Sequence, residues 1–364
     1  MPNNPLLNFT LSVALTIAIG WLLVIGQSIL LPILSAVIAV YVIVTASDAL
    51  GRLPLMDKLP EAILRFTVLF ISTAVIAIIT TVVTLTVREI SAGVPIYEAN
   101  LERLLTGFAS TFDLDTQEVI AEVRSVTIDR IRLRPLILGA LSSFTSVGTT
   151  VFLIVIYAAF LLAERGGFKR KVREAFGHEG RAERVSEVIG VMNRNIGEYL
   201  TIKTLINLIL GGISLAILVV LGIDFALFWA ISIALLNYIP YVGSFVGVVL
   251  PTVFSLAQFG SFTTSIVLGV MLTIAQVFVG NYLEPKLIGR QLNLSPFVVI
   301  VSLVFWTSLW GVPGAILAIP MTSVLVIGLA SFSQTRFLAV LMANHIESVP
   351  RRSEVSRSPE APAE

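Results

Sequence analysis

Hydrophobic residues fill two long stretches in the second half of this chain, almost without interruption by charge. Between residues 204 and 283 the only charged residue is Asp224, and between 291 and 335 there is none. Pro and Gly nevertheless interrupt both stretches repeatedly. Backbone groups cannot be left unpaired against lipid, so helix breaks at membrane depth occur where protein or a water-filled cavity surrounds them. The pattern therefore predicts a membrane-embedded core with broken helices, the setting in which transporters build substrate sites.

Five apolar segments precede the broken region, and each is long enough, or nearly so, to cross a bilayer as a helix. They are residues 9–25, 29–46, 63–87, 136–163 and 204–221. Only Gly26, Gln27 and Ser28 separate the first two, which predicts a tight helical hairpin. The chain before Thr10 contains no Lys or Arg, which argues against a secretory signal peptide.

Two polar segments of different character lie between these spans. Residues 88–135 hold six Arg and eight Asp or Glu, with apolar residues at helical spacing. We expect a small helical unit outside the membrane, with a second helix beginning near Asp115. Residues 164–203 hold nine Lys or Arg against six Glu, and the positive-inside rule makes this segment cytoplasmic. Its helix over 181–200 carries an apolar stripe suited to the interface or to neighbouring helices.

Counting spans from the basic segment gives the orientation of the chain. Both termini are then cytoplasmic, and residues 88–135, the polar segment after the third span, lie outside. The predicted regions are three N-terminal spans (1–87), an extracytoplasmic helical segment (88–135), a fourth span (136–163), a cytoplasmic basic segment (164–203), the transport core (204–335) and a cytoplasmic tail (336–364).

The transport core contains two pairs of apolar runs that are short for a membrane span. The first pair, 225–237 and 245–258, flanks a break that contains Pro240 and Gly243. A full span over 262–282 follows, and then 296–309 and 315–329 flank a second break, from Trp310 to Gly314. The pattern favours two re-entrant helical hairpins arranged as an inverted repeat. Two tightly packed pairs of ordinary spans also satisfy the same hydropathy.

Composition supports an all-α polytopic membrane protein of about six to eight membrane segments. Hydrophobic residues make up 56% of the chain, charged residues 13%, and the mean hydropathy is +0.94. A formal net charge of +1 points to no nucleic-acid partner, and the absence of Cys excludes disulfides and cysteine-ligated metals. No phosphate-binding loop or His-Glu-x-x-His motif occurs, and both His lie outside the apolar runs. We therefore expect no enzyme, no cofactor and no metal site.

Unwound backbone in the core makes the breaks the best candidates for substrate or ion binding. The candidate residues are Asn237, Tyr238, Pro240, Gly243, Asn281, Glu284, Pro285, Arg290, Gly311, Pro313 and Gly314. Glu284 closes a long uncharged span and could couple transport to protons; the alternative is an interfacial salt bridge with Lys286 or Arg290. Asp224 is a second proton-coupling candidate, or else it caps a turn.

The break motifs resemble those of a known family. These are Asn237-Tyr-Ile-Pro-Tyr-Val-Gly243, Asn281-Tyr-Leu-Glu-Pro-Lys-Leu-Ile-Gly-Arg290 and Gly311-Val-Pro-Gly314. Together with the early spans and the basic loop, they make the whole chain similar to the autoinducer-2 exporter family of bacterial permeases. The resemblance implies a multi-pass protein of the bacterial inner membrane that exports small signalling molecules. Some members are sodium or lithium/proton antiporters, and a homo-oligomer is implied, with pentamers reported for relatives.

Three functions follow as hypotheses. The first is a secondary transporter that exports a small polar or amphipathic solute, either with or without coupling to protons. The second is a monovalent-cation/proton antiporter, which would need titratable groups in the core. The third is a non-transporting scaffold in the lipid bilayer, against which the broken helices weigh because a structural bundle gains nothing from them.

Overall fold

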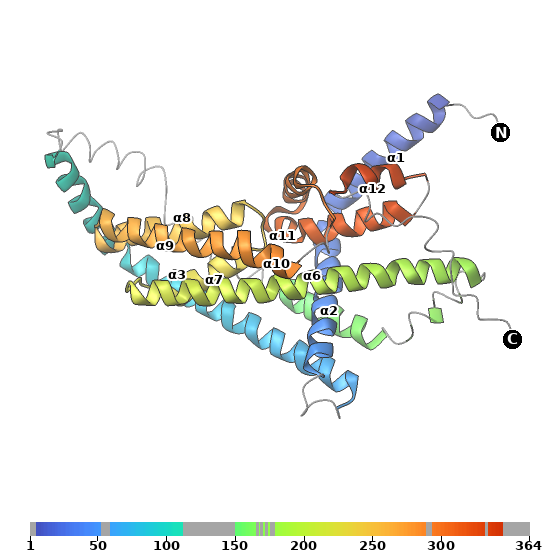
Figure 1. Cartoon of the computed structure of the whole chain (residues 1–364), viewed down its shortest axis with the longest axis horizontal. Coiled ribbons are helices and arrows are strands. Elements are labelled where there is room, and N and C mark those ends of the chain that lie inside the picture. The colour runs from blue at the N-terminus through green and yellow to red at the C-terminus, as the bar shows by residue number, and fades with distance from the viewer. Residues whose placement is uncertain are drawn as a thin grey trace. The chain divides into compact units, whose positions relative to one another are not determined.

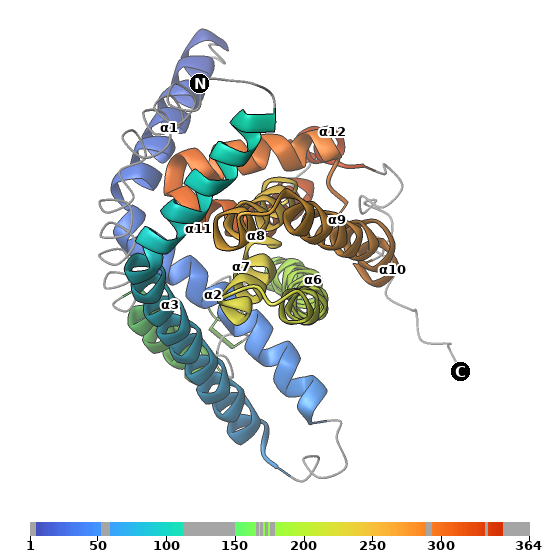
Figure 2. The same cartoon turned by 90° about the vertical axis from the view of Figure 1, so that its left-hand side faces the viewer.

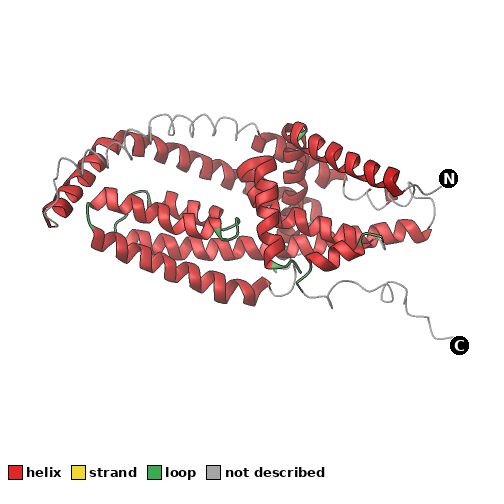
Figure 3. Cartoon of the chain, turned by 90° about the horizontal axis from the view of Figure 1, so that it is seen from above, coloured by secondary structure: helices red, strands yellow, loops and turns green. Residues whose placement is uncertain are grey.

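The chain folds into helices throughout the part that the structure, a computed structural model, describes. That part comprises residues 5–51, 59–111, 150–164, 179–288, 293–331 and 334–344, with positions 167, 170, 171 and 174. Figure 1 follows the helices along the chain, and Figure 3 shows helices and loops but no strand among the described residues. Six of these helices are long and apolar enough to cross a membrane. The predicted all-α polytopic membrane protein is thereby confirmed.

The helix bounds are as follows. They are α1 (Pro5–Ile25), α2 (Gln27–Leu50), α3 (Glu61–Thr111), an unlabelled helix (Thr150–Glu164), α6 (Glu179–Val220), α7 (Ala226–Leu236), α8 (Val242–Phe259), α9 (Phe262–Phe278), the π-helix η2 (Val279–Leu283), α10 (Glu284–Ile288), α11 (Pro296–Ser331) and α12 (Arg336–Met342).

The chain divides into two compact units. The first unit comprises Met1–Thr45, Tyr157–Leu200 and Arg290–Glu364, and the second comprises Ala46–Ile156 and Thr201–Gly289. Each predicted helix break belongs to a different unit, the earlier break to the second unit and the later one to the first.

In the second unit, α8 packs against both α7 and α9, and α3 packs on α7 and α8 (Figure 2). Large apolar side chains from α6, α7 and α9, among them Leu210, Trp229 and Leu268, form its core. The outward faces of α8 and α9 carry exposed apolar residues such as Phe245 and Ile266. These faces are suited to contact with lipid, because their side chains are apolar and the backbone polar groups are paired within the helices.

The α7–α8 pair forms a hairpin around the predicted first break. At 11 residues, α7 is about 16 Å long, roughly half the hydrocarbon thickness of a bilayer. The chain turns through Tyr241, which has a positive φ of 59°. A Cβ at Gly243 would lie 1.7 Å from the carbonyl oxygen of Leu236. Glycine is therefore required where the two helices meet.

The second break divides α11 in the first unit. Gly311 has a non-helical conformation (φ 63°, ψ −144°), so α11 consists of two helices across a kink. The indole Nε1 of Trp306 donates to Oγ1 of Thr322 at 3.0 Å, and a Cβ at Gly314 would lie 2.0 Å from the carbonyl oxygen of Trp306. The chain thus folds back on itself after the break, as the Pro and Gly pattern predicted.

The prediction of a tight hairpin between the first two spans is wrong. The backbone N–H of Gly26 donates to Leu22 O, and Gly26 O accepts from Leu30 N, both at 2.8 Å. Gly26 thus makes helical hydrogen bonds to both the preceding and the following turn. Helix α2 therefore continues from α1 with a bend (Figure 1). Near the bend, Nε1 of Trp310 donates to Leu23 O at 3.1 Å. This bond satisfies a carbonyl in the last turn of α1, where intrahelical partners run out.

Two further helix boundaries differ from the expected ones. The third span continues as α3 far into the polar segment after it, because no strong breaker stands between them and Pro95 is accommodated inside the helix. The predicted 181–200 helix and the fifth span form one helix, α6, since no Pro or cap separates them. The expected helix near Asp115 and the first half of the fourth span lie outside the described residues.

Candidate functional site at the α7–α8 break

Asn237 ends α7 and faces the interior of the second unit, where the hairpin turns. Its side chain is buried, as is that of Asn207 on α6. Nδ2 of Asn237 donates to Oδ1 of Asn207 at 2.8 Å. A buried amide is tolerated when it is hydrogen-bonded, so the pair stabilises the break in an otherwise apolar core.

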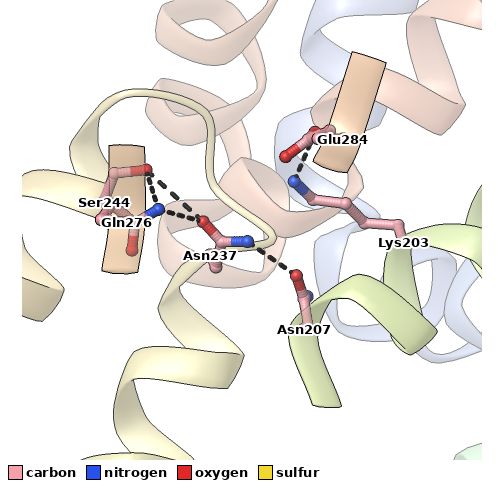
Figure 4. A network of polar contacts seen from close by, with 6 residues as sticks. All are labelled: Lys203, Asn207, Asn237, Ser244, Gln276 and Glu284. Carbon is pink, nitrogen blue, oxygen red and sulfur yellow. Dashed lines mark hydrogen bonds and ion pairs between the residues drawn. The ribbon is translucent and has the colours of Figure 1, made fainter. Parts of the chain in front are cut away.

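Gln276 on α9 and Ser244 at the start of α8 extend this pair into a network (Figure 4). Nε2 of Gln276 donates to Oδ1 of Asn237 at 2.8 Å and to Oγ of Ser244 at 2.9 Å. Oγ of Ser244 in turn donates to Oδ1 of Asn237 at 3.4 Å. Three helices and the hairpin turn therefore converge on one cluster of amide and hydroxyl groups, which we call the amide cluster.

A charged pair lies in the same close-up as the amide cluster (Figure 4). Nζ of Lys203 on α6 lies 2.7 Å from Oε1 of Glu284, which begins α10. The Lys203 side chain is 7% exposed and that of Glu284 27%. Lys203 and Asn207 are four residues apart, so both side chains lie on one face of α6.

The π-helix η2 positions Glu284. In a regular helix, residue 284 would lie about 80° around the axis from Gln276, eight residues earlier. A π-turn accommodates one additional residue, which reduces the offset to about 20°. The segment Val279–Leu283 is such a turn, directly before Glu284. It therefore brings the carboxylate onto the face of the helix that carries Gln276.

Tyr238 and Thr204 connect the hairpin turn to α6 beside the charged pair. The Tyr238 hydroxyl and Oγ1 of Thr204 are 2.7 Å apart. Nδ2 of Asn207 is buried and makes no well-formed hydrogen bond among the described residues, and the Tyr238 hydroxyl is its polar neighbour. The amide cluster thus holds a weakly bonded N–H donor, together with hydroxyl groups and an ion pair. Such an arrangement can bind polar groups of a solute at the end of a broken helix.

The structure brings together some of the predicted site residues and separates others. Asn237, Tyr238 and Gly243 lie in the hairpin turn with Pro240, and Glu284 lies beside Lys203. Asn281 and Pro285 are exposed. Gly311, Pro313 and Gly314 belong to the first unit, and Arg290 lies outside the described residues.

Asp224 is exposed and far along the hairpin from its turn. Its backbone N–H donates to Oε1 of Gln258 at 2.9 Å, and Nε2 of Gln258 donates to Gly222 O at 3.0 Å. These bonds join the start of α7 to the end of α8. They agree with the capping or turn role that was the alternative for this residue.

Lys203 is the site residue that the sequence pattern did not single out. It was assigned to the cytoplasmic basic segment, and a salt bridge of Glu284 with Lys286 or Arg290 was given as the alternative to proton coupling. Instead, Nζ of Lys286 lies over the Tyr282 ring, 5.6 Å from its centroid. The available signal was the four-residue spacing from Lys203 to Asn207, which puts a charge and an amide on one helical face.

These features define a class of protein: a polytopic membrane protein with a polar, charged site at a helix break inside an apolar unit, which is how transporters are built. Comparison with known proteins agrees. Residues 11–333 match the model of the AI-2E transporter family. The chain belongs to this family, and the expected resemblance is confirmed.

Several relatives carry transport names. A provisionally named transport protein of Haemophilus influenzae is 31% identical over 71% of this chain and 75% of its own length. The AI-2 transport protein TqsA of Escherichia coli K12 is 32% identical over 57% of this chain and 60% of its own length. A provisionally named transport protein of Borreliella burgdorferi is 34% identical over 55% of this chain and 54% of its own length. The chain thus spans between about half and three quarters of the relatives that it matches.

Proposed function

We propose that this protein is a secondary transporter that exports a small polar or amphipathic solute through the second unit, with the amide cluster as the solute-contact site. The observation that carries the proposal is the convergence of Asn207, Asn237 and Gln276 at the turn of a hairpin whose first helix, α7, is too short to span the bilayer. Polar side chains are costly inside a membrane protein and are retained where a function uses them.

The amide cluster can exchange its internal hydrogen bonds for bonds to a solute. Amide groups both donate and accept, and a solute hydroxyl does the same, so it can enter between two amides and bond to both. Nδ2 of Asn207 supplies a buried donor that makes no well-formed hydrogen bond and has the Tyr238 hydroxyl as its neighbour. We infer that Glu284 carries a coupling proton, because its partly exposed carboxylate lies beside the cluster. Proton uptake and solute binding then occur at neighbouring positions.

The substrate class follows from the same chemistry. Hydroxyl- and carbonyl-bearing molecules match the donors and acceptors of the amide cluster. The relative TqsA is named as an AI-2 transport protein, and a small signalling molecule is therefore one substrate to test first.

Exchange of a monovalent cation for a proton is the second candidate, and the presence of Glu284 at the site favours it. A cation needs oxygen ligands. Oδ1 of Asn237 already accepts from Gln276 and Ser244, and Oδ1 of Asn207 accepts from Asn237. Both oxygens are thus already used within the cluster, and a cation would have to displace these hydrogen bonds to be coordinated by them.

Reconstituted liposomes test both candidates. With an imposed sodium gradient and a trapped pH dye, the solute transporter should give no sodium-dependent proton movement, whereas the antiporter would give it. Efflux of labelled AI-2 is expected from the wild type and to fall about tenfold or more in Gln276→Leu, because two buried acceptors lose their donor. Thr273→Val, one turn earlier on α9, removes only a hydroxyl bonded within its own helix and should leave efflux unchanged. Equal efflux in both variants would contradict the proposed site.

We also propose that Glu284→Gln removes proton coupling while the protein remains folded. Glutamine keeps the shape of the side chain and an oxygen acceptor for Lys203, but it cannot take up a proton. Solute-driven pH change should therefore disappear in this variant. Unchanged coupling would remove Glu284 from the mechanism.

Inner-membrane location, cytoplasmic termini and a homo-oligomeric assembly complete the proposal. The chain has no Cys, so a single introduced Cys can be labelled without background. In intact cells, a membrane-impermeant thiol reagent should label Ser110→Cys on the exposed end of α3 and should spare Lys171→Cys in the basic segment. The opposite pattern would invert the orientation.

A further inference from the structure

Lys203 is a buried cation whose partner is more accessible than Lys203 itself. Its side chain is 7% exposed, whereas that of Glu284 is 27% exposed. Their Nζ–Oε1 distance of 2.7 Å is that of a charge-assisted hydrogen bond. Glu284 is therefore the more accessible member of the pair, which Figure 4 shows in close-up.

The surroundings of the pair contain little to replace Glu284 as a counter-charge. Among the described residues, Lys286 is the neighbouring cation on the element of Glu284, and its Nζ lies over the Tyr282 ring. The hairpin turn contributes the Tyr238 hydroxyl, which is bonded to Thr204. No second carboxylate forms an ion pair with Lys203 in the described part of the chain.

This asymmetry has an electrostatic consequence. If Glu284 takes a proton, Lys203 remains buried with an uncompensated positive charge, which is strongly unfavourable. An anion that enters the site restores neutrality. Nδ2 of Asn207, one helical turn from Lys203 and next to the Tyr238 hydroxyl, is a buried N–H donor without a well-formed hydrogen bond, and it can turn to a second oxygen of that anion. The positive charge and the donor thus converge on one face of α6.

We propose that Lys203 is an anion-binding residue, and that the transported solute carries a carboxylate or phosphate group whose arrival accompanies protonation of Glu284. This inference rests on the proposed function and names its substrate class. The proton binds to the Glu284 carboxylate, and the solute oxyanion pairs with Nζ of Lys203. The proton and the solute are then released together on the opposite side of the membrane. For a monoanion such as a carboxylate, one proton moves with one negative charge, so the cycle is electroneutral and an anion that accumulates inside drives its own export.

Binding can be tested without knowledge of the natural solute. Glu284→Gln mimics the protonated carboxylate and leaves Lys203 without its counter-charge. Gluconate or phosphate, compared with sorbitol and with chloride at equal ionic strength, should raise the melting temperature of this variant by about 5 °C at saturation. The double variant Lys203→Gln/Glu284→Gln should show no such rise, and Lys286→Gln/Glu284→Gln should retain it. If Glu284→Gln gains no more stability from these anions than the Lys203 double variant, the inference is overturned.

Flux measurements separate this inference from the proposed function. Liposomes loaded with gluconate and a pH dye should show internal alkalinisation as gluconate leaves, unaffected by a clamped membrane potential. Lys203→Gln should lower that flux about tenfold or more. Efflux of sorbitol instead of gluconate would overturn the anion site while leaving a transporter. Anion-dependent stabilisation without flux of gluconate, phosphate or AI-2 would support the site and contradict the proposed transport.

Discussion

Substitution of Gly243 by alanine is expected to disrupt the α7–α8 hairpin. An added Cβ would lie 1.7 Å from the carbonyl oxygen of Leu236 and 2.5 Å from its carbonyl carbon. The normal carbon–oxygen contact is about 3.3 Å, so the two backbone segments would have to separate by about 1.6 Å. Both atoms belong to backbone, and no side-chain rotation can relieve the clash.

The cost of this separation follows from what the hairpin turn holds. Moving the two segments apart strains the bond from Gly243 N to Ile239 O and displaces Asn237 from its partners in the amide cluster. Overpacking and broken buried hydrogen bonds together cost about 3 kcal/mol or more. We expect Gly243→Ala to lower the melting temperature by about 5 °C or more and to abolish transport.

Two other glycines provide matched controls. At Gly212 on α6 an added Cβ would meet nothing within 4 Å, and at Gly247 on α8 the nearest atoms, of Ile233, lie at 3.6 Å. Alanine should be neutral at Gly247 and neutral or stabilising, by up to about 1 kcal/mol, at Gly212. Thermal unfolding of purified protein, followed by tryptophan fluorescence, measures all three variants. Equal stability of Gly243→Ala and the controls would refute the close approach at the turn.

Three more variants test other parts of the structure by thermal unfolding. Asn100→Ala should destabilise by about 1–2 kcal/mol, because its Nδ2 donates to two carbonyls in the last turn of α8 at 3.1 and 2.7 Å; an unchanged melting temperature would argue against docking of α3 there. Trp310→Phe should cost about 1–3 kcal/mol, since it leaves Leu23 O without its indole donor; no loss would mean that water replaces the indole. Lys203→Met should destabilise more than Lys203→Met/Glu284→Met, because removal of one partner leaves a charge unpaired; the reverse order would contradict burial of the pair.

Much of the fold could be predicted from the chain because its signals are local. Each break was located by its Pro and Gly, and Gly311 and Tyr241 do adopt non-helical conformations there. Helix ends were harder, since α3 and α6 pass through expected boundaries without a strong stop signal. Trp near the ends of membrane spans is typically found at the membrane interface, yet Trp306 and Trp310 are 4% and 1% exposed. Their indole N–H groups are both used inside the first unit.

The sequence by itself determined the membrane class, the helical architecture, the family and the positions of the breaks, because hydropathy, composition and backbone propensity depend on neighbouring residues alone. Only the tertiary structure decided which polar side chains meet. Asn207, Asn237 and Gln276 come from three different helices, and Lys203 reaches Glu284 across 81 residues of chain. The π-turn that rotates Glu284 toward Gln276 carries no sequence signature, since its additional residue is accommodated by packing. The site therefore arises from helix register and contact between distant segments, which a linear pattern does not contain.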